Sequence, residues 1–285
     1  MEITDKIHLL KIDFDIVAGP GKIIPRFVNV IIIFGKKITL IDTGVKNSEG
    51  KIAGYFESNN RHLSELETII LSHSHPDHIG SASLLKRKTG CRVLAHKNEV
   101  AWMRDPELQN RERPVPGFFN LVDEGVDPDG LLTGGAIFQA DENITIEIIH
   151  SPGHSPGSLN LLFREDRIMF TADSVPVMND IPNYHNAGEL LQSLEKIKTE
   201  KRYDLLLTSW TPPLKSKDEI NRMIADGESY IRKIGDIVKN TYRGDEPGPL
   251  AFCTEAVMEL GLPAFLSTPV VDKALRSHLT TGLKN

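Results

Sequence analysis

The stretch from His73 to His78 places three histidines and one aspartate within six residues, directly after an apolar run. That run, Thr68 to Leu71, is rich in β-branched residues and predicts a short buried strand over 67–71. The polar cluster therefore lies beyond the carboxyl end of a strand, where α/β sheets commonly carry ligands. A solvated histidine-rich loop would have the same composition, but packing rarely needs so many imidazoles at one strand end. We therefore interpret the cluster as a metal site.

The spacing of the cluster indicates how it would hold metal. His73 and His75 are two residues apart, so in an extended backbone their side chains point to the same side and can coordinate one ion. Pro76 then turns the chain, which places Asp77 and His78 at the start of the next helix, facing the same hollow. Two adjoining metal positions are the expected result. Imidazole together with carboxylate suits zinc, iron or manganese, whereas calcium prefers oxygen ligands throughout.

Three other strand ends carry residues that belong with this cluster. The segment 151–158 places His154 in a turn made by two prolines and two glycines, which presents a single ligand rigidly. Asp173 follows a predicted strand over 167–170, and we expect it to complete the site together with His154. Asp42 ends another strand. It either orients a ligating histidine or forms an Asx turn, and the sequence leaves both open.

Composition and charge exclude several classes of protein. The 285 residues are 40% hydrophobic and 25% charged, which predicts one large globular domain with an appendage. A net charge of −6 argues against a nucleic-acid partner, which would need a basic patch. No leader peptide and no run of membrane-spanning length are evident, so we expect a cytoplasmic protein with no membrane partner. The two cysteines, Cys91 and Cys253, are expected to be buried and unpaired.

Regular elements are expected along most of the chain. Strands are predicted over 7–16, 27–34, 37–41, 67–71, 92–95, 144–149, 159–163, 167–170 and 204–207. Helices are predicted over 48–59, 79–88, 97–103, 187–199 and 218–239, with shorter ones near 252–260 and 270–279. The alternation of strands and helices indicates an α/β fold. The helices of the tail are expected to cover the β layers or to form a homodimer contact.

The segment 105–135 is rich in proline, glycine and charge and shows little periodicity. A stretch of this kind inside a compact domain is usually a functional lid or partly disordered. Trp102, Phe118 and Phe119 would either line an apolar substrate pocket or pin the segment to the core. We expect this segment and the helical tail to build the substrate pocket.

Four separated motifs carry a family resemblance. His73-Ser74-His75-Pro76-Asp77-His78 resembles the H-x-H-x-D-H signature of the metallo-β-lactamase superfamily. The other usual motifs of that family are matched in order by Asp42-Thr43-Gly44, Pro152-Gly153-His154 and Thr171-Ala172-Asp173. The resemblance covers about residues 25–210 and implies a four-layer αβ/βα sandwich with its site along the sheet edges. We expect this domain to span residues 1–212 and a helical C-terminal extension to span 213–285.

The resemblance also implies a ligand set. His73, His75 and His154 would hold one metal ion, while Asp77, His78 and a bridging Asp173 would hold a second. Zinc is the expected metal, as one or two ions, with iron or manganese as alternatives. Asp77 would also be the catalytic residue, because by family analogy it lies close enough to the attacking water to hold or accept its proton.

One family position is not matched. The family generally has a further histidine after the strand that corresponds to 204–207, and this chain has Trp210 there, which cannot ligate. Either the site is mononuclear or another donor fills the position, for which His185 is the nearest candidate in the sequence. The remaining histidines are given no ligand role. His96 and His150 are expected to be hydrogen-bonded structural residues, and His8, His62 and His278 are expected at the surface.

The motif style favours one reaction class. The P-G-H-S-P-G-S turn and the T-A-D motif resemble those of glyoxalase II, lactonases and related enzymes. This resemblance implies a metal-dependent hydrolase of a small ester, lactone or thioester. A mononuclear iron oxidoreductase resembling persulfide dioxygenases is one alternative, because such enzymes omit part of the second ligand set. A metal-binding module without turnover is another, although the presence of Asp77 speaks against it. In each case the partner is a small molecule.

Overall fold

The computed structural model describes residues 1–19, 21–244, 248 and 250–280, and within this part of the chain the first sheet has six strands. Their order across the sheet is β1 (Ile7–Gly19), β2 (Lys22–Phe34), β3 (Ile38–Ile41), β4 (Leu66–Ile70), β5 (Arg92–His96) and β6 (Gly130–Leu132). The first three strands are antiparallel, and β3 to β6 run parallel. Parallel strands end at the same edge, so the segments that follow β3, β4 and β5 meet there.

The second sheet is built from the middle of the chain. Its order is β11 (Leu205–Leu207), β10 (Ile168–Phe170), β9 (Leu159–Phe163), β8 (Ile144–His150) and β7 (Ile137–Asp141). Neighbouring strands are antiparallel except β10 and β11, which are parallel. The sequence analysis missed β7, which has largely half-exposed or exposed side chains and therefore lacks a continuous apolar run. The other strands of this sheet were predicted within two residues of their observed bounds.

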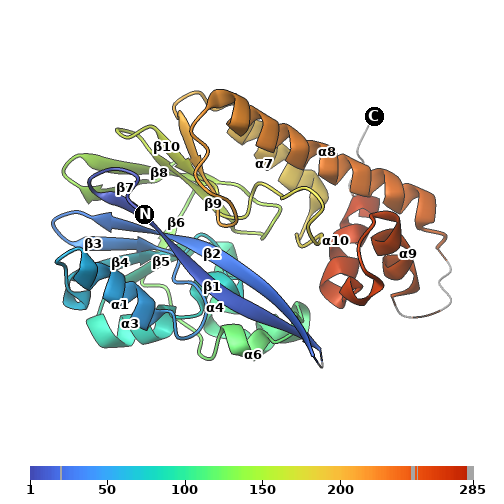
Figure 1. Ribbon diagram of the computed structural model, residues 1–285, viewed down its shortest axis with the longest axis horizontal. Coiled ribbons are helices and arrows are strands. Elements are labelled where there is room, and N and C mark those ends of the chain that lie inside the picture. The colour runs from blue at the N-terminus through green and yellow to red at the C-terminus, as the bar shows by residue number, and fades with distance from the viewer. Residues whose placement is uncertain (20, 245–247, 249, 281–285) are drawn as a thin grey trace.

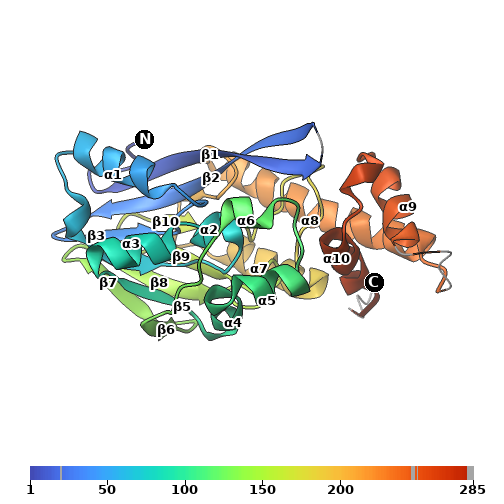
Figure 2. The same cartoon turned by 90° about the horizontal axis from the view of Figure 1, so that it is seen from below.

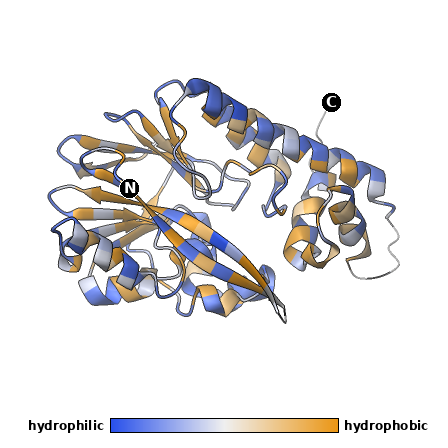
Figure 3. Cartoon of the chain, viewed as in Figure 1, coloured by the Kyte–Doolittle hydropathy of each residue, from blue (hydrophilic) through white to orange (hydrophobic). Residues whose placement is uncertain are grey.

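Three apolar clusters lie between the four layers of helices and sheets. Between the sheets, Ile31 and Ile33 of β2 pack in one cluster with Ile146 and Leu161 of the second sheet. On the outer face of the first sheet lie α1 (Glu49–Ser58) and α3 (Ala82–Thr89), and on that of the second lies α7 (Ala187–Thr199). Figures 1 and 2 show this arrangement. In Figure 3 the strands are mainly hydrophobic, whereas the helices carry hydrophilic residues on their outer sides. The predicted four-layer αβ/βα fold is confirmed.

The C-terminal helices share a core with the second sheet. They are α8 (Lys217–Thr241), α9 (Ala251–Glu259) and α10 (Pro269–Thr280). Their buried residues form one apolar cluster with α7 and with Leu162 and Met169 of the sheet. The helical C-terminal region is therefore as predicted, while the boundary at residue 212 stays a prediction. None of the helices in the described part of the chain has both the length and the apolar character needed to cross a membrane.

The prediction of a partly disordered segment over 105–135 is wrong, while a lid role stays a prediction. The segment forms α5 (Pro106–Glu112), α6 (Phe118–Leu121) and β6, and it follows α4 (Val100–Arg104). Each element is too short to show a hydrophobic period, but α5 has clear local signals: Asp105 accepts a hydrogen bond from the Leu108 amide, and Pro106 occupies the first turn. Short capped helices explain why this segment is ordered although its sequence shows no hydrophobic periodicity.

Two predictions of surface histidines are also wrong. His8 on β1 is buried, its Nδ1 lies 3.1 Å from the Tyr55 hydroxyl, and its ring packs edge-on against Phe34. His278 on α10 is buried, and its Nε2 lies 2.6 Å from the Tyr184 hydroxyl. Both histidines lie on the inner face of an element whose packing partner is distant in the sequence. His62 is exposed, and both cysteines are buried and free, as predicted.

Candidate metal centre

The six predicted ligand residues gather at the edge where the two sheets end. His73 and His75 lie in the segment after β4, while Asp77 and His78 lie in the short helix α2 (Pro76–Ile79). The turn after β8 supplies His154, and the segment after β10 supplies Asp173. Two groups of three potential ligand atoms, each within 4.8 Å of one another, are found among the described residues: His73, His75 and His154, and His73, His78 and Asp173.

Three imidazole nitrogens converge in the first group. His73 Nε2 lies 3.0 Å from His75 Nδ1, and His154 Nε2 lies 2.8 Å from the same His75 atom. All three side chains are buried. His73 and His75 come from the segment after β4, while the third histidine reaches them from the turn after β8 in the opposite sheet.

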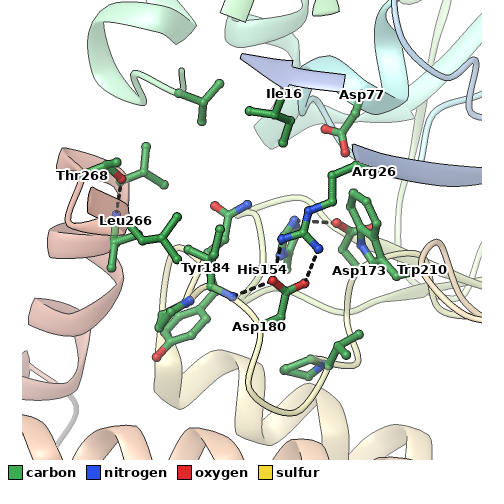
Figure 4. Close-up of a pocket in the computed structure, with 18 of the residues that line it drawn as sticks. Ile16, Arg26, Asp77, His154, Asp173, Asp180, Tyr184, Trp210, Leu266 and Thr268 are labelled. Carbon is green, nitrogen blue, oxygen red and sulfur yellow. Dashed lines mark hydrogen bonds and ion pairs between the residues drawn. The ribbon is translucent and has the colours of Figure 1, made fainter. Parts of the chain in front are cut away.

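Carboxylates join the second group. Asp173 Oδ1 lies 3.2 Å from His78 Nε2, and Asp173 Oδ2 lies 3.3 Å from His154 Nε2. Asp173 therefore lies between the two groups, which is the bridging position expected from the resemblance. Asp77 Oδ2 is 3.7 Å from His78 Nε2. Asp77 also lines the neighbouring cavity, labelled in Figure 4.

Asp42 fixes the orientation and the tautomer of two of these histidines. Its Oδ2 accepts a hydrogen bond from His78 Nδ1 at 2.8 Å, which leaves the lone pair of neutral His78 on Nε2. The Ser72 hydroxyl donates to the same carboxylate at 2.7 Å, so Ser72 Oγ accepts from His73 Nδ1 at 3.0 Å. The lone pair of His73 is thereby also on Nε2. Of the two roles left open for Asp42, orienting a histidine is the one observed.

The backbone around the site adopts conformations that ordinary residues rarely adopt. Asp42 has φ 61° and Ala172, directly before Asp173, has φ 45°. Gly153, directly before His154, has φ 131°, and a Cβ atom there would lie 2.3 Å from the Leu190 amide nitrogen of α7. A glycine is therefore required for the turn to pack against α7 and to point His154 at the other histidines.

The first group is neutral at pH 7. Burial lowers the pKa values of His73 and His75 well below the usual range, and the charges of neighbouring cationic groups add to this effect. Burial likewise lowers the pKa of His154 to about 4. Neutral imidazole is the form that binds a metal ion, so these three residues are in the required state.

The second group concentrates negative charge. Burial by itself would lower the pKa of His78, but three carboxylates outweigh it and raise the pKa well above its usual range: Asp173, Asp42 and Asp77. Burial would raise the pKa of Asp173, yet the charges of His78 and His154 hold it well below the usual range. Burial raises the pKa of Asp77, and the charge of Asp173 adds to this rise against the opposing effect of His78. A cation, either a proton or a metal ion, is needed at the centre of this group.

The residues present fit a metal ion of the zinc, iron or manganese type. Among the described residues, His78 Nε2 and Asp173 Oδ1 are buried 3.2 Å apart, and neither has a hydrogen-bond partner apart from this mutual contact. They face each other, and the tautomer set by Asp42 puts a lone pair on the histidine side. Buried polar atoms without partners are costly, and a coordinated cation would satisfy them. The mixed nitrogen and oxygen donor set does not distinguish among these metals.

Glu99 joins the two segments that carry the first group, and the sequence analysis missed it. Its carboxylate is buried and accepts hydrogen bonds from both Ser74 and the turn after β8. The Ser74 amide donates to Oε2 at 2.9 Å, and the Gly157 amide donates to Oε1 at 2.5 Å. The Ser155 hydroxyl also donates to Oε1, at 2.5 Å. No local pattern marks Glu99, because its partners lie 25 and 58 residues away.

Arg113 is a second residue that sequence analysis missed. It lines the cavity together with Asp77, His154 and Asp173, and its guanidinium donates a hydrogen bond to Asn183 Oδ1. Burial lowers its pKa to about 10 against the raising effects of Asp77 and Asp173, so it remains cationic at pH 7. Arg113 follows α5, in the segment whose order the sequence did not reveal.

Trp210 and the other histidines are not part of the two ligand groups. Trp210 lines the cavity beside Asp173 (Figure 4), and its indole has no lone pair to offer. His185, considered as a replacement donor, is exposed. His96 and His150 stack with ring centroids 4.3 Å apart, and His150 Nε2 lies 3.1 Å from the Pro156 carbonyl oxygen.

The aromatic residues considered for the pocket pack elsewhere. Trp102 Nε1 donates to Glu112 at 2.7 Å, Phe118 is buried in the core on the outer face of the first sheet, and Phe119 is exposed. None of the three lines the cavity beside the candidate ligand residues. Pinning of the segment to the core is therefore observed for Phe118, while Trp102 joins α4 to α5 through Glu112. The segment contributes other residues to the cavity, namely Arg113, Val115, Pro116 and Leu121.

Known proteins resemble this chain in sequence and in fold. It is 29% identical over 107 residues to a probable metallo-hydrolase, YqgX, of Bacillus subtilis, covering 37% of this chain and 47% of the relative. It is also 29% identical over 111 residues to a hydroxyacylglutathione hydrolase of Rhodopseudomonas palustris, covering 39% and 34%. The matches thus span less than half the length of these relatives.

A solved structure resembles nearly the whole chain. A metallo-beta-lactamase family protein from Thermus thermophilus superimposes with a TM-score of 0.77 at 16% identity, covering 98% of this chain and 94% of the other. The fold is therefore shared through the C-terminal helices as well. The model of the metallo-beta-lactamase superfamily matches residues 23–209, which include all six candidate ligands. On these grounds the chain belongs to the metallo-beta-lactamase superfamily.

Proposed function

We propose that the protein is a metal-dependent hydrolase that acts on a small ester, lactone or thioester. The observation that carries the proposal is the convergence of neutral imidazole nitrogens and carboxylates at a buried point where His78 Nε2 and Asp173 Oδ1 have only each other as partner. Its family and its similarity to a hydroxyacylglutathione hydrolase support this reaction class. A site that held metal only for structure would not need Asp77 at the cavity wall.

The residues have distinct roles in this proposal. His73, His75 and His154 hold one ion, zinc by preference, and His78, Asp77 and Asp173 form a second position. When bound, such an ion lowers the pKa of a water ligand and polarises the carbonyl of the substrate. Asp77 accepts the proton of the attacking water, because its carboxylate is at the cavity wall and next to His78.

Arg113 supplies a fixed positive charge in the same cavity. A buried guanidinium is worth more to a developing oxyanion than an exposed one, because water does not screen it. Trp210 occupies the place of the family's last histidine, so the second position has fewer ligands than usual. Arg113 would therefore supply part of the positive charge that a fully liganded second ion provides.

The first test is metal identity and stoichiometry by elemental analysis, on protein purified without added metal or chelator. One or two zinc ions per chain, together with hydrolysis of generic esters, lactones or thioesters, are the expected result. One iron per chain with oxygen consumption would replace hydrolysis by the persulfide-dioxygenase-like alternative. Absence of bound metal and of turnover would contradict the proposal.

The Trp210→His variant tests the second position directly. An imidazole at residue 210 restores the usual ligand, so we expect the metal content to rise toward two ions per chain. His62→Ala, at an exposed histidine, serves as the matched control and should bind as the unaltered chain does. An unchanged stoichiometry in Trp210→His, with the fold intact, would show that Trp210 is not what limits the second position.

A further inference from the structure

A cavity of about 190 Å³ extends from the candidate ligand residues to the C-terminal helices. Its polar end contains Asp77, His154 and Asp173. Figure 4 shows Leu266 and Thr268 of the C-terminal segment on one side of it, and Asp173 and Trp210 on the other. The cavity is therefore enclosed by parts of the chain that are far apart in the sequence.

The walls away from the cluster are mainly apolar. The β1–β2 hairpin contributes Phe14, Ile16 and Ile24, which share one face because Ile16 pairs with Ile24 and side chains alternate along a strand. The segment after β10 adds Val175, Pro176 and Val177, and the C-terminal region adds Leu266, Val270 and Val271. Three separate regions thus present aliphatic side chains to the same space.

Three polar side chains in these walls, Arg26, Tyr184 and Tyr230, have partners within the protein. Arg26 forms two hydrogen bonds with the Asp180 carboxylate, at 3.0 and 2.7 Å, which are drawn in Figure 4. Tyr230 donates its hydroxyl hydrogen to the Asp180 carbonyl oxygen at 2.5 Å, and the Tyr184 hydroxyl lies 2.6 Å from His278 Nε2. A ligand that enters this space therefore meets mainly apolar surface, together with the paired charges of Arg26 and Asp180.

We propose that this cavity binds an apolar acyl chain, so that the substrate is an aliphatic acyl ester or thioester. This inference rests on the proposed function for the bond that is cleaved. The carbonyl lies at the cluster, next to Arg113, and the chain extends between the hairpin and the C-terminal helices. A charged peptide-like acyl group would lose its hydration without gaining hydrogen bonds from walls whose polar groups are paired.

Binding is measured first, without reference to turnover. The chain has two tryptophans, so in a Trp102→Phe background the fluorescence of Trp210 reports on the cavity alone. The probe is 8-bromo-1-octanol, a neutral chain whose bromine quenches indole fluorescence at close range. We expect saturable quenching by this probe and none by 2-bromoethanol at equal concentration. Equal, non-saturating quenching by both probes would overturn the inference.

Two pairs of variants link the binding to the cavity. Leu266→Glu and Ile16→Glu each put a carboxylate into a different wall of the cavity, and both should reduce binding at least tenfold. The matched controls are Met258→Glu on α9 and Val17→Glu on the other face of β1, both at exposed positions. The controls should bind the probe as the background variant does. Since the two cavity positions are only half-buried, failure of one variant to fold leaves the other to decide.

Turnover separates this inference from the proposed function. Across acetyl, butanoyl, hexanoyl and octanoyl esters of one leaving group, we expect kcat/KM to rise by about fourfold per added methylene until the cavity is full. In Leu266→Glu the ratio of octanoyl to acetyl hydrolysis should fall at least tenfold. If the rate of hydrolysis does not depend on chain length, the acyl-chain inference is wrong while the proposed hydrolase function stands. If the probe binds but no ester is hydrolysed, the acyl-chain site stands while the proposed hydrolase function is wrong.

Discussion

The two ends of the cavity are built in different ways. At the polar end, Asp42 and Ser72 hold the side chains of His78 and His73 by hydrogen bonds, and Glu99 holds together the two chain segments that carry His75 and His154. At the apolar end, the walls are aliphatic side chains that pack without directional partners. The polar end therefore tolerates little change in geometry, whereas the apolar end can change its shape at a smaller cost. This difference would let one reaction serve acyl chains of different size.

The largest expected effect is at the polar end. In His75→Ala the nitrogen that lies within 3.0 Å of both His73 and His154 is removed. Metal binding and hydrolysis should be lost together, by more than the 10- to 100-fold that loss of an outer hydrogen-bond partner costs. Metal content and kcat/KM are measured beside His62→Ala, which should match the unaltered chain. Retention of both properties would refute the ligand assignment.

A smaller effect is expected when an outer partner is altered. Glu99→Gln keeps the size of the side chain but turns one acceptor oxygen into a donor, which then faces a buried amide or hydroxyl hydrogen. The affinity for zinc should fall by about 10- to 100-fold, measured by competition with a chelator. Glu107→Gln, at an exposed position of α5, is the control. An unchanged zinc affinity would mean that the two ligand segments keep their positions without Glu99.

The smallest effect concerns His278, whose partner Tyr184 lines the cavity. Burial lowers the pKa of His278 to about 4, below its usual value of 6.5, so between these values the unfolded chain binds more protons than the folded one. The contribution of neutral His278 to the free energy of unfolding is fully present above pH 6.5, and it is lost as the pH falls toward 4. Between pH 7 and pH 5 the loss amounts to about 2 kcal/mol.

The His278→Asn variant checks this sign. Urea unfolding at pH 7 and pH 5 should show a smaller decrease in the free energy of unfolding for the variant than for the unaltered chain. His62→Asn should keep the full decrease, because that side chain is exposed in the folded protein. If all three proteins lose equal stability, His278 is protonated in the folded state, and the α10 contact with Tyr184 does not depend on its neutral form.

The sequence determined the polar end almost completely, because local patterns encode it. Strand ends can be located from short apolar runs, and His73, His154 and Asp173 all follow such runs, so their meeting at one edge follows from the αβ/βα fold implied by the motifs. The structure brings all six candidate ligands together, and it adds the way in which Asp42 sets two tautomers.

Only the tertiary structure decided the rest of the site. Glu99 and Arg113 act through partners tens of residues away, and neither lies in a periodic pattern. The segment 105–135 looked irregular because its helices are shorter than the window in which a hydrophobic period shows, and tertiary contacts order it. The burial of His278 likewise depends on how α10 packs. Local chemistry determines which residues can bind a metal, whereas long-range packing determines what surrounds them and therefore which substrate can reach them.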